Sequence, residues 1–280
     1  MENYKKLIGS ITIITFSYAA SRVLGFFREI LLANWAGVSE ATDTLDLAFI
    51  IPDFLFYLSA GGYLAITLIP IMSEKKKSEL NNYFLSILYG ISLIFIILSL
   101  ITYSFRFQFA ELLGVTSLDF FVEVFTPIIF SQVFFFIGAI LMSYQYFHDN
   151  FKYAAIAPVV YNSTIIFFGW INSSTPEGTI KGFAIGTLIG SALGHFLIQI
   201  YGAKKSGLSF DLVSPKFIHI KDYITISLPL ILGQSIAVVD EQLFRVFGSF
   251  LAAGSIATFR YARRIALLPV GIIAQAVGVA

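Results

Sequence analysis

The sequence contains no cysteine, which excludes disulfides, thiol nucleophiles and thiolate metal sites within these 280 residues. Charged residues are also scarce, at 12% of the chain against roughly 25% in soluble domains. No basic run is longer than Lys75–Lys77 and the formal net charge is +1, so nothing indicates nucleic-acid binding. Hydrophobic residues make up 57% of the chain, which is typical of an all-α polytopic membrane protein.

Long stretches without Asp, Glu, Lys or Arg predict the membrane spans, each of which needs about 20 apolar residues. Together with three charge-bearing helices near the ends, these stretches predict about eight transmembrane helices, at residues 7–33, 41–73, 80–105, 124–148, 153–176, 182–203, 223–250 and from 255 onward. The second is too long for one straight helix, and Pro52 and Gly61-Gly62 predict a kink. The apolar stretch after MENYKK has no small-residue cleavage site, so we expect a retained first helix.

Lysines divide unequally between the two sets of loops. The N-terminal segment and every second loop carry ten of the eighteen basic residues: Lys5, Lys6, Lys75, Lys76, Lys77, Lys152, Lys204, Lys205, Lys216 and Lys221. The opposite loops carry only Arg106 and Lys181. By the positive-inside rule, the N-terminus of this multi-pass membrane protein is expected on the cytoplasmic side.

Arginines, in contrast, fall inside or near the predicted spans. The six that do so are Arg22, Arg28, Arg245, Arg260, Arg263 and Arg264. Because a charge within a bilayer is costly, such residues mark a functional site by default. Arginine stays charged and its planar fork fits phosphate or carboxylate, so these residues predict a wet cavity that binds an anion.

Structural ion pairing is the alternative for several of these charges. Arg22 and Glu29 are seven residues apart on one helix face, and Glu241 and Arg245 have the spacing of a helical ion pair. For Asp43 and Asp46, the alternative to a binding role is that they are negative charges near the N-terminus of a solvated helix. Asp53, which follows Pro52, is a candidate cap for a broken helix.

Two other patterns concern packing. Gly182, Gly186, Gly190 and Gly194 recur at every fourth residue, which predicts a small-residue face for close helix packing. The segment 204–222 is expected to lie on the cytoplasmic surface as a short amphipathic stretch.

An internal repeat joins the two ends of the chain. The segment FFREILLANWAG at 26–37 aligns without a gap with LFRVFGSFLAAG at 243–254, so Arg28 meets Arg245. Helices 1 and 7 are then equivalent, as in transporters built from parallel repeats. We therefore predict a six-helix N-terminal lobe at 1–203, a cytoplasmic linker at 204–222, and the first two helices of a second, truncated lobe at 223–280.

Several motifs resemble the MurJ (MviN) family, the lipid II flippases of peptidoglycan synthesis. They are SRVLGFFRE at 21–29, ATD at 41–43, IPIMSE at 69–74, Pro158 with Asn162, GSI at 254–256, YARR at 261–264 and LPVG at 268–271. The resemblance implies the fold of the multidrug/oligosaccharidyl-lipid/polysaccharide exporters, with two six-helix lobes around a central cavity. It also implies a function in cell wall biogenesis and cell shape.

The resemblance further implies which residues bind. Arg22, Arg28 and Arg264 match cavity arginines thought to hold the substrate's pyrophosphate, and Asp43 matches the helix 2 aspartate. Arg260 shares a helix face with Arg264 and is added as a substrate-binding candidate. Asp240 matches an aspartate of a sodium site in some members. No cofactor is expected other than coupling to a sodium ion or to the membrane potential.

The sequence also departs from the family pattern. Glu29 stands where aspartate is usual, and Arg263 replaces a residue that is commonly acidic. Phe56-Tyr57 and Gly61 occupy the positions of an arginine pair and a glutamate. These departures leave the identity of the lipid-linked sugar open.

The leading hypothesis is a non-enzymatic flippase that moves an undecaprenyl-pyrophosphate-linked precursor, lipid II, across the membrane by alternating access. The alternatives within the same fold are a flippase for another undecaprenyl-linked oligosaccharide and a cation-coupled drug exporter. A polyprenyl-phosphate transferase would need clustered carboxylates in one loop, with a metal, and Asp43 and Asp46 stand alone. A non-transporting remnant of a larger transporter is the last alternative.

Overall fold

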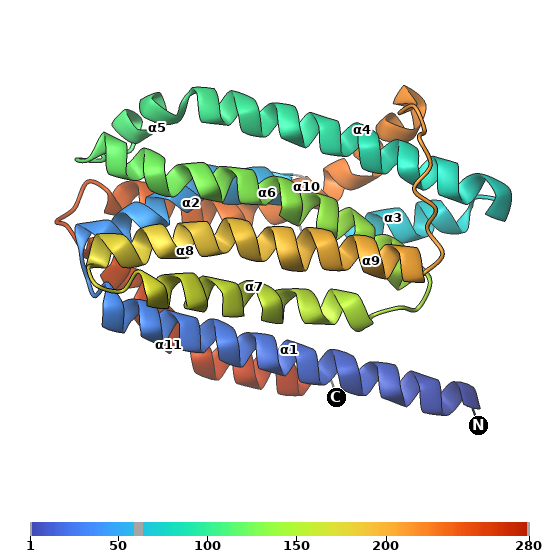
Figure 1. Ribbon diagram of the computed structural model, residues 1–280, viewed down its shortest axis with the longest axis horizontal. Coiled ribbons are helices and arrows are strands. Elements are labelled where there is room, and N and C mark those ends of the chain that lie inside the picture. Colours follow the sequence, from blue (N-terminus) through green and yellow to red (C-terminus); the bar gives the residue numbers. More distant parts are fainter. Residues whose placement is uncertain (1, 59–63, 279–280) are drawn as a thin grey trace.

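The protein is described by a computed structural model, which shows an all-helical bundle (Figure 1). The structure describes the backbone of residues 2–58 and 64–278 and the side chains of residues 19–56, 67–230, 233, 239 and 242–266. In chain order, the helices are α1 (Glu2–Trp35), α2 (Glu40–Leu58), α3 (Leu64–Ser73), α4 (Lys77–Ser104), α5 (Arg106–Leu112), α6 (Leu118–Phe147), α7 (Lys152–Ile171), α8 (Pro176–Gly190), the π-helical segment η2 (Ser191–Leu197), α9 (Ile198–Lys205), α10 (Phe217–Gly248) and α11 (Ser255–Gly278).

Within the described backbone, every predicted span corresponds to one helix or to one run of consecutive helices. The long second span corresponds to α2 and α3, with Pro52 inside α2, whereas Gly61-Gly62 lies outside the described residues. The last span of the first lobe corresponds to the run α8–η2–α9. Four described stretches are long and apolar enough to cross a membrane: Lys77–Ser104, Leu118–Phe147, Lys152–Ile171 and Pro176–Lys205.

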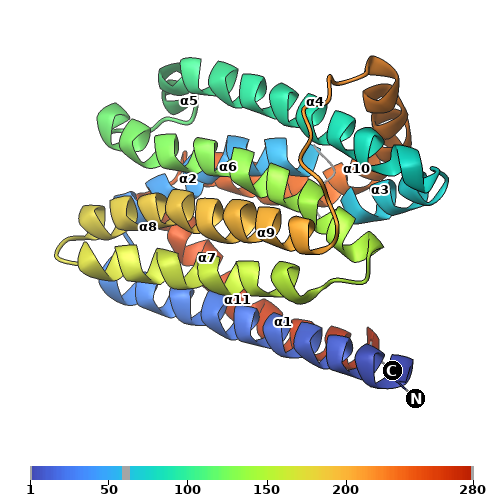
Figure 2. The ribbon, with the colours of Figure 1, turned by 45° about the vertical axis from the view of Figure 1, so that its right-hand side comes forward.

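The loops gather at two opposite ends of the bundle, as Figures 1 and 2 show. The α3–α4, α6–α7 and α9–α10 connections lie at the end where the chain begins, and the α1–α2, α7–α8 and α10–α11 connections lie at the other end. We call the first of these the lysine end, because it carries Lys75, Lys76, Lys77, Lys152, Lys204, Lys205, Lys216 and Lys221. The alternation of lysine-rich and lysine-poor loops along the sequence thus becomes a polarity of the whole molecule.

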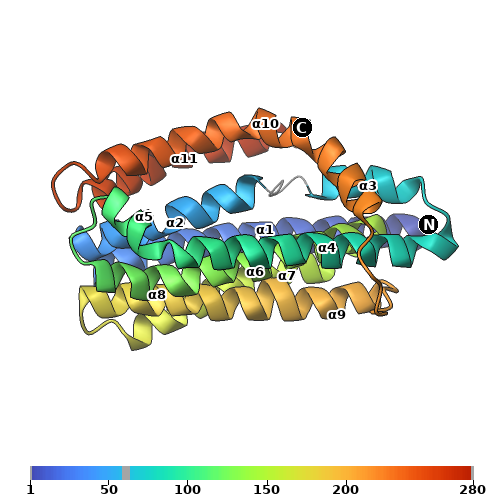
Figure 3. The same cartoon turned by 90° about the horizontal axis from the view of Figure 1, so that it is seen from above.

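Helices α10 and α11 lie on the α2 side of the bundle, away from α8 and α9, as the view from above shows (Figure 3). Helix α10 contacts α2, α3 and α4, and α11 contacts α2 and α10. The linker is shorter than predicted, because α9 continues to Lys205 and α10 begins at Phe217. The division into two lobes stays a prediction.

The glycine face of α8 and η2 packs directly against the backbone of α7. A Cβ atom added at Gly186 would lie 2.7 Å from Cα of Ile165, and one at Gly194 would lie 2.6 Å from the carbonyl oxygen of Ala157. At Gly190 the distance to the carbonyl oxygen of Tyr161 would be 3.0 Å. The predicted small-residue packing is therefore confirmed.

Replacing Gly186 by alanine is expected to destabilise the bundle by about 1–3 kcal/mol, because the added methyl group meets backbone that cannot shift alone. The control is Gly25→Ala in α1, where an added Cβ has no neighbour within 4 Å and alanine favours the helix. Thermal unfolding of the detergent-solubilised protein should give a lower Tm for Gly186→Ala and an unchanged or higher Tm for Gly25→Ala. Equal Tm values for the two variants would contradict the packing argument.

Candidate functional site

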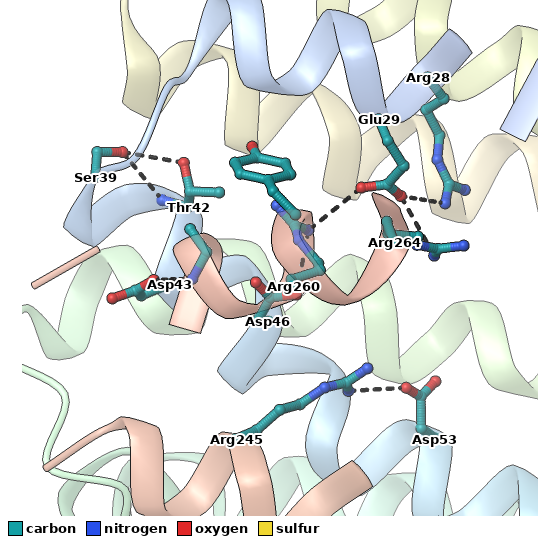
Figure 4. Close-up of polar contacts among 12 residues, drawn as sticks. Arg28, Glu29, Ser39, Thr42, Asp43, Asp46, Asp53, Arg245, Arg260 and Arg264 are labelled. Carbon is teal, nitrogen blue, oxygen red and sulfur yellow. Dashed lines mark hydrogen bonds and ion pairs between the residues drawn. The ribbon is translucent and has the colours of Figure 1, made fainter. Parts of the chain in front are cut away.

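Glu29 of α1 is the centre of a cluster of arginines (Figure 4). Its Oε1 lies 2.9 Å from Nη2 of Arg28 and 3.5 Å from Nη2 of Arg264, and its Oε2 lies 3.9 Å from Nη1 of Arg260. The Glu29 side chain is only 7% exposed. A buried carboxylate between helices distant in sequence thus joins α1 to α11.

Arg28 is also fixed from α7. Its Nη1 donates a hydrogen bond of 3.1 Å to Oδ1 of Asn162, which is buried. The amide nitrogen of Asn162 donates to the carbonyl oxygen of Pro158 at 2.9 Å, and this bond orients the amide. The proline–asparagine pair therefore sets the direction of the Arg28 guanidinium group.

Helix α2 presents carboxylates to α10 and α11 on one face, at positions 43, 46 and 53. Asp46 accepts a hydrogen bond of 3.2 Å from Nη1 of Arg260 and Asp53 accepts one of 3.0 Å from Nη1 of Arg245. The Asp46 side chain is 6% exposed and that of Arg260 is 17% exposed. Burying the two as a pair avoids the large cost of an unpaired charge.

Arg260 keeps unused hydrogen-bonding capacity in the cluster. Its Nε and Nη2 atoms are buried and make no hydrogen bond to the described residues, and the same holds for Oε2 of Glu29 and Oδ2 of Asp46. Nε and Nη2 form the edge with which a guanidinium group binds an oxyanion through two parallel bonds. Because these atoms are buried, an oxyanion could reach this edge only if the side chains around Arg260 moved apart.

Asp43 contacts the backbone at the start of α11. Its Oδ2 accepts a hydrogen bond of 2.6 Å from the N–H of Gly254 and its Oδ1 accepts one of 2.7 Å from the N–H of Ala257. The first N–H groups of a helix lack partners within the helix and favour negative charge. Asp43 of α2 thus caps a helix from a distant part of the chain, whereas its expected contact with a substrate stays a prediction.

The repeat of the sequence has a counterpart in these contacts. Arg28 and Arg245, which align in the repeat, both pair with a carboxylate. Gly37 and Gly254 also align, and both have a positive φ, of 65° and 86° respectively, in the turn that leads into the next helix. The same local geometry is therefore used at both turns.

The structure brings together most of the binding candidates, but not all. Arg28, Arg260 and Arg264 meet at Glu29, and Arg264 remains 56% exposed. Arg22 is exposed and lies outside this group. The alternative pairing of Arg22 with Glu29 is wrong, since the arginines within 4 Å of Glu29 in the described part of the chain are Arg28, Arg260 and Arg264.

Other candidates fall outside the described side chains. Asp240 and Glu241 are among them, so the sodium site and the pairing of Glu241 with Arg245 stay predictions. Among the residues that were described, no group of three His, Asp or Glu side chains could hold a metal ion. Arg245 is half-buried and pairs with Asp53, which is therefore an ion-pair partner rather than only a cap.

Sequence reasoning missed the specific partners of the arginines. Asn162 was recognised only as part of a motif, and Asp46 only as a charge near a helix end. One available signal was the spacing of Asp43, Asp46 and Asp53, which places three carboxylates on one face of α2. A carboxylate face inside an apolar helix requires a basic or N–H-bearing partner.

Replacing Asp43 by alanine should destabilise the first turn of α11. Removing a capping side chain costs about 1–2 kcal/mol, so amide hydrogen exchange around Gly254–Ala257 should become roughly 5- to 30-fold faster. Asp43→Asn should give an intermediate rate, because an amide offers one acceptor oxygen for two N–H groups. The control is Glu40→Gln, an exposed charge in the first turn of α2, which should leave exchange at Gly254–Ala257 unchanged. Unchanged exchange in Asp43→Ala would refute the capping role.

Comparison with known proteins identifies relatives along nearly the whole chain. A sequence model described as "Lipid II flippase MurJ" matches residues 32–280. A lipid II flippase MurJ of Thermosipho africanus is 33% identical over 194 residues, which cover 66% of this chain and 40% of that protein. A probable lipid II flippase MurJ of Buchnera aphidicola subsp. Acyrthosiphon pisum is 30% identical over 289 residues, covering 97% of this chain and 54% of that protein.

A solved structure agrees with these sequence matches. It is titled "Lipid II flippase MurJ, inward closed conformation", superposes with a TM-score of 0.78 at 27% identity, and is matched over 93% of this chain and 55% of its own length. The chain thus spans about half the length of the relatives it matches. The match of the family's sequence model to residues 32–280, together with the shared fold, shows that the chain belongs to the lipid II flippase MurJ family.

Proposed function

We propose that this chain takes part in moving lipid II, a lipid-linked peptidoglycan precursor, across the bacterial cytoplasmic membrane by alternating access, without catalysing a reaction. The observation that supports this most directly is the arginine cluster around Glu29, at the contact between α1 and α11. In transporters built from repeats, the substrate site lies where the repeats meet. An undecaprenyl-linked precursor offers a pyrophosphate that fits such a cluster.

The charge balance of the cluster favours an anion. Arg28, Arg260 and Arg264 contribute three positive charges, against two negative charges from Glu29 and Asp46, the carboxylates that pair with them. The nearby carboxylate of Asp43 is taken up by N–H groups at the start of α11. The buried Nε–Nη2 edge of Arg260 would add a fork of the kind that binds phosphate oxygens in pairs once the cluster opens. A drug exporter for cations would need an excess of carboxylates here.

An exchange of ion-pair partners by the arginines would allow α11 to move away from α1. Separating a buried ion pair leaves an uncompensated charge, which costs several kcal/mol. If the pyrophosphate replaces the carboxylate of Glu29 on Arg260 and Arg264, these arginines remain paired while α11 leaves α1. Substrate binding would thereby weaken the contact that holds the two helices together in its absence.

The identity of the sugar is argued from the residues that replace the family's arginine pair. At one position where the family often has arginine, Phe56 packs edge-on against Phe135, with ring centroids 6.1 Å apart. An aromatic contact thus takes the place of a charge, which favours another undecaprenyl-linked oligosaccharide as the alternative substrate. Coupling to a sodium ion, with Asp240 as a ligand, or to the membrane potential belongs to the same proposal.

The function is tested in cells depleted of their own flippase that express the complete product of this gene. Arg28→Ala should abolish growth, and Arg28→Lys should restore little, because lysine keeps the charge and loses the two-pronged fork. The matched control is Arg106→Ala, which removes a guanidinium group on α5 that contacts Tyr103 and not the cluster. Membrane abundance of each variant is measured in parallel. Full growth with Arg28→Ala would count against a substrate role.

The orientation is proposed with the lysine end in the cytoplasm. It is supported by the gathering of lysine-bearing loops at one end and of Arg106 and Lys181 at the other. Cysteines placed at Ser78, at the lysine end, and at Ser174, in the α7–α8 loop, should react with an impermeant reagent from opposite sides of the membrane. Only the Ser174 variant should react in intact cells. Labelling of both variants, or of Ser78 alone, would reject this orientation.

A further inference from the structure

The segment between α9 and α10 is an extended strap, defined here as residues 206–216. It is tied to α4 through side chains. The N–H of Ser209 donates to Oδ1 of Asn81 at 3.1 Å, the hydroxyl of Tyr89 donates to the carbonyl oxygen of Asp211 at 3.1 Å, and the N–H of Lys216 donates to Oγ of Ser86 at 2.8 Å. Backbone without helical hydrogen bonds is therefore held in one course along the bundle.

The strap and the start of α10 have an inner and an outer apolar face. Leu208 is 4% exposed and packs into the core with Phe210 and Val213. Leu212 is 102% exposed, Phe217 is 78% exposed and Ile218 is 55% exposed. Three large apolar side chains exposed within seven residues beside an ordered backbone indicate an interaction surface.

The strap lies at the boundary between the charged tip and the apolar body of the bundle. It crosses α4 between Asn81 and Tyr89, roughly 6 to 18 Å from the first residue of that helix. The stretch of α4 without charged residues begins after Glu79, and its row of exposed aliphatic residues begins at Leu93. The outer face of the strap thus lies at the level expected for lipid headgroups.

Lysines without carboxylate partners surround this outer face. Among the described residues, none of the eight lysines of the lysine end lies within the 4.0 Å of a carboxylate that defines an ion pair here, in contrast to Lys181, which pairs with Glu123. Nζ of Lys204 lies 5.6 Å from the ring centroid of Phe210, and Lys205 and Lys216 flank the strap. These charges are available for external phosphate groups.

The pKa of His219 can serve as a probe of the same surface. Its ring lies 4.5 Å from that of Tyr83, and Nζ of Lys75 lies 4.4 Å from the centroid of the Tyr83 ring. Burial lowers the pKa of His219, Lys216 and Lys75 lower it further by repulsion, and Asp222 opposes them. An anion bound near the two lysines should oppose their repulsion and raise the pKa of His219.

We propose that the strap and the first turn of α10 form an interfacial anchor for anionic phospholipid. Leu212 and Phe217 enter the boundary between headgroups and acyl chains, while Lys204, Lys205 and Lys216 bind the phosphate groups of the leaflet at the lysine end. Apolar insertion combined with lysine attraction is the way in which interfacial segments select anionic membranes. The anchor is independent of the transported substrate.

The test uses Leu212→Cys carrying a nitroxide label, in otherwise cysteine-free protein reconstituted into vesicles of phosphatidylcholine alone or of phosphatidylcholine mixed with phosphatidylglycerol. Collision rates with oxygen and with a water-soluble nickel complex give the depth of the label. We expect the label to move from water to the interface when phosphatidylglycerol is added. The control is labelled Ser78→Cys, at the polar tip of the lysine end, which should stay in water in both vesicles.

A triple variant, Lys204→Gln, Lys205→Gln and Lys216→Gln, separates charge from apolar insertion. It should abolish the dependence of label depth on phosphatidylglycerol, whereas Lys181→Gln at the opposite end should not. In the unlabelled protein, phosphatidylglycerol should raise the NMR-measured pKa of His219 by at least half a unit, and the triple variant should lose this shift. A label that stays in water in both vesicles, or that inserts equally in both, would overturn the proposal.

Discussion

The burial of Glu29, Asp43 and Asp46 against α11 is the constraint on which the arrangement of the chain depends. A carboxylate that leaves water must find positive charge or N–H donors, and an unpaired one would cost several kcal/mol. Here the partners are the guanidinium groups of α11 and the N–H groups at its first turn. These interactions are directional, so they fix both the axial position and the rotation of α11 against α1 and α2. General apolar packing would fix neither.

The sequence was sufficient to predict the long helices and which of their ends share a side of the bundle, although not the short α5, because both follow from local composition. Charge-free stretches predicted where helices lie, and the alternation of lysine-bearing loops predicted which loops share an end of the bundle. The spacing of Gly186, Gly190 and Gly194 predicted a close helix contact, although not that α7 is the neighbour. Helix ends were less predictable. Segment 217–222 was assigned to a linker, but α10 begins at Phe217, directly after Lys216, whose N–H donates to Oγ of Ser86 in α4.

The site was only half predictable, because its residues act through partners that are far away in the chain. The high free-energy cost of placing a charged side chain in lipid identified Arg28 and Arg264 as unusual residues. This argument needs no knowledge of the fold. It does not say that Arg28 contacts Asn162 of α7, or that Arg260 contacts Asp46 of α2. For Asp43 the residue type was itself ambiguous, since a carboxylate binds equally well to a ligand or to a helix start. Only the three-dimensional structure distinguishes binding a ligand from capping a helix.

The unequal use of lysine and arginine explains this difference in predictability. Lysine carries a compact, strongly hydrated charge and remains in water at the lysine end, where no protein partner is required. The end of the bundle at which the lysines lie can therefore be predicted from the composition of the loops alone. Arginine is less strongly hydrated and enters the bundle when a carboxylate or amide takes up its donors, as Glu29, Asp46 and Asn162 do. Each buried arginine consequently specifies a tertiary contact. These contacts could not be predicted from the sequence, and they are also the contacts that hold α11 against α1 and α2.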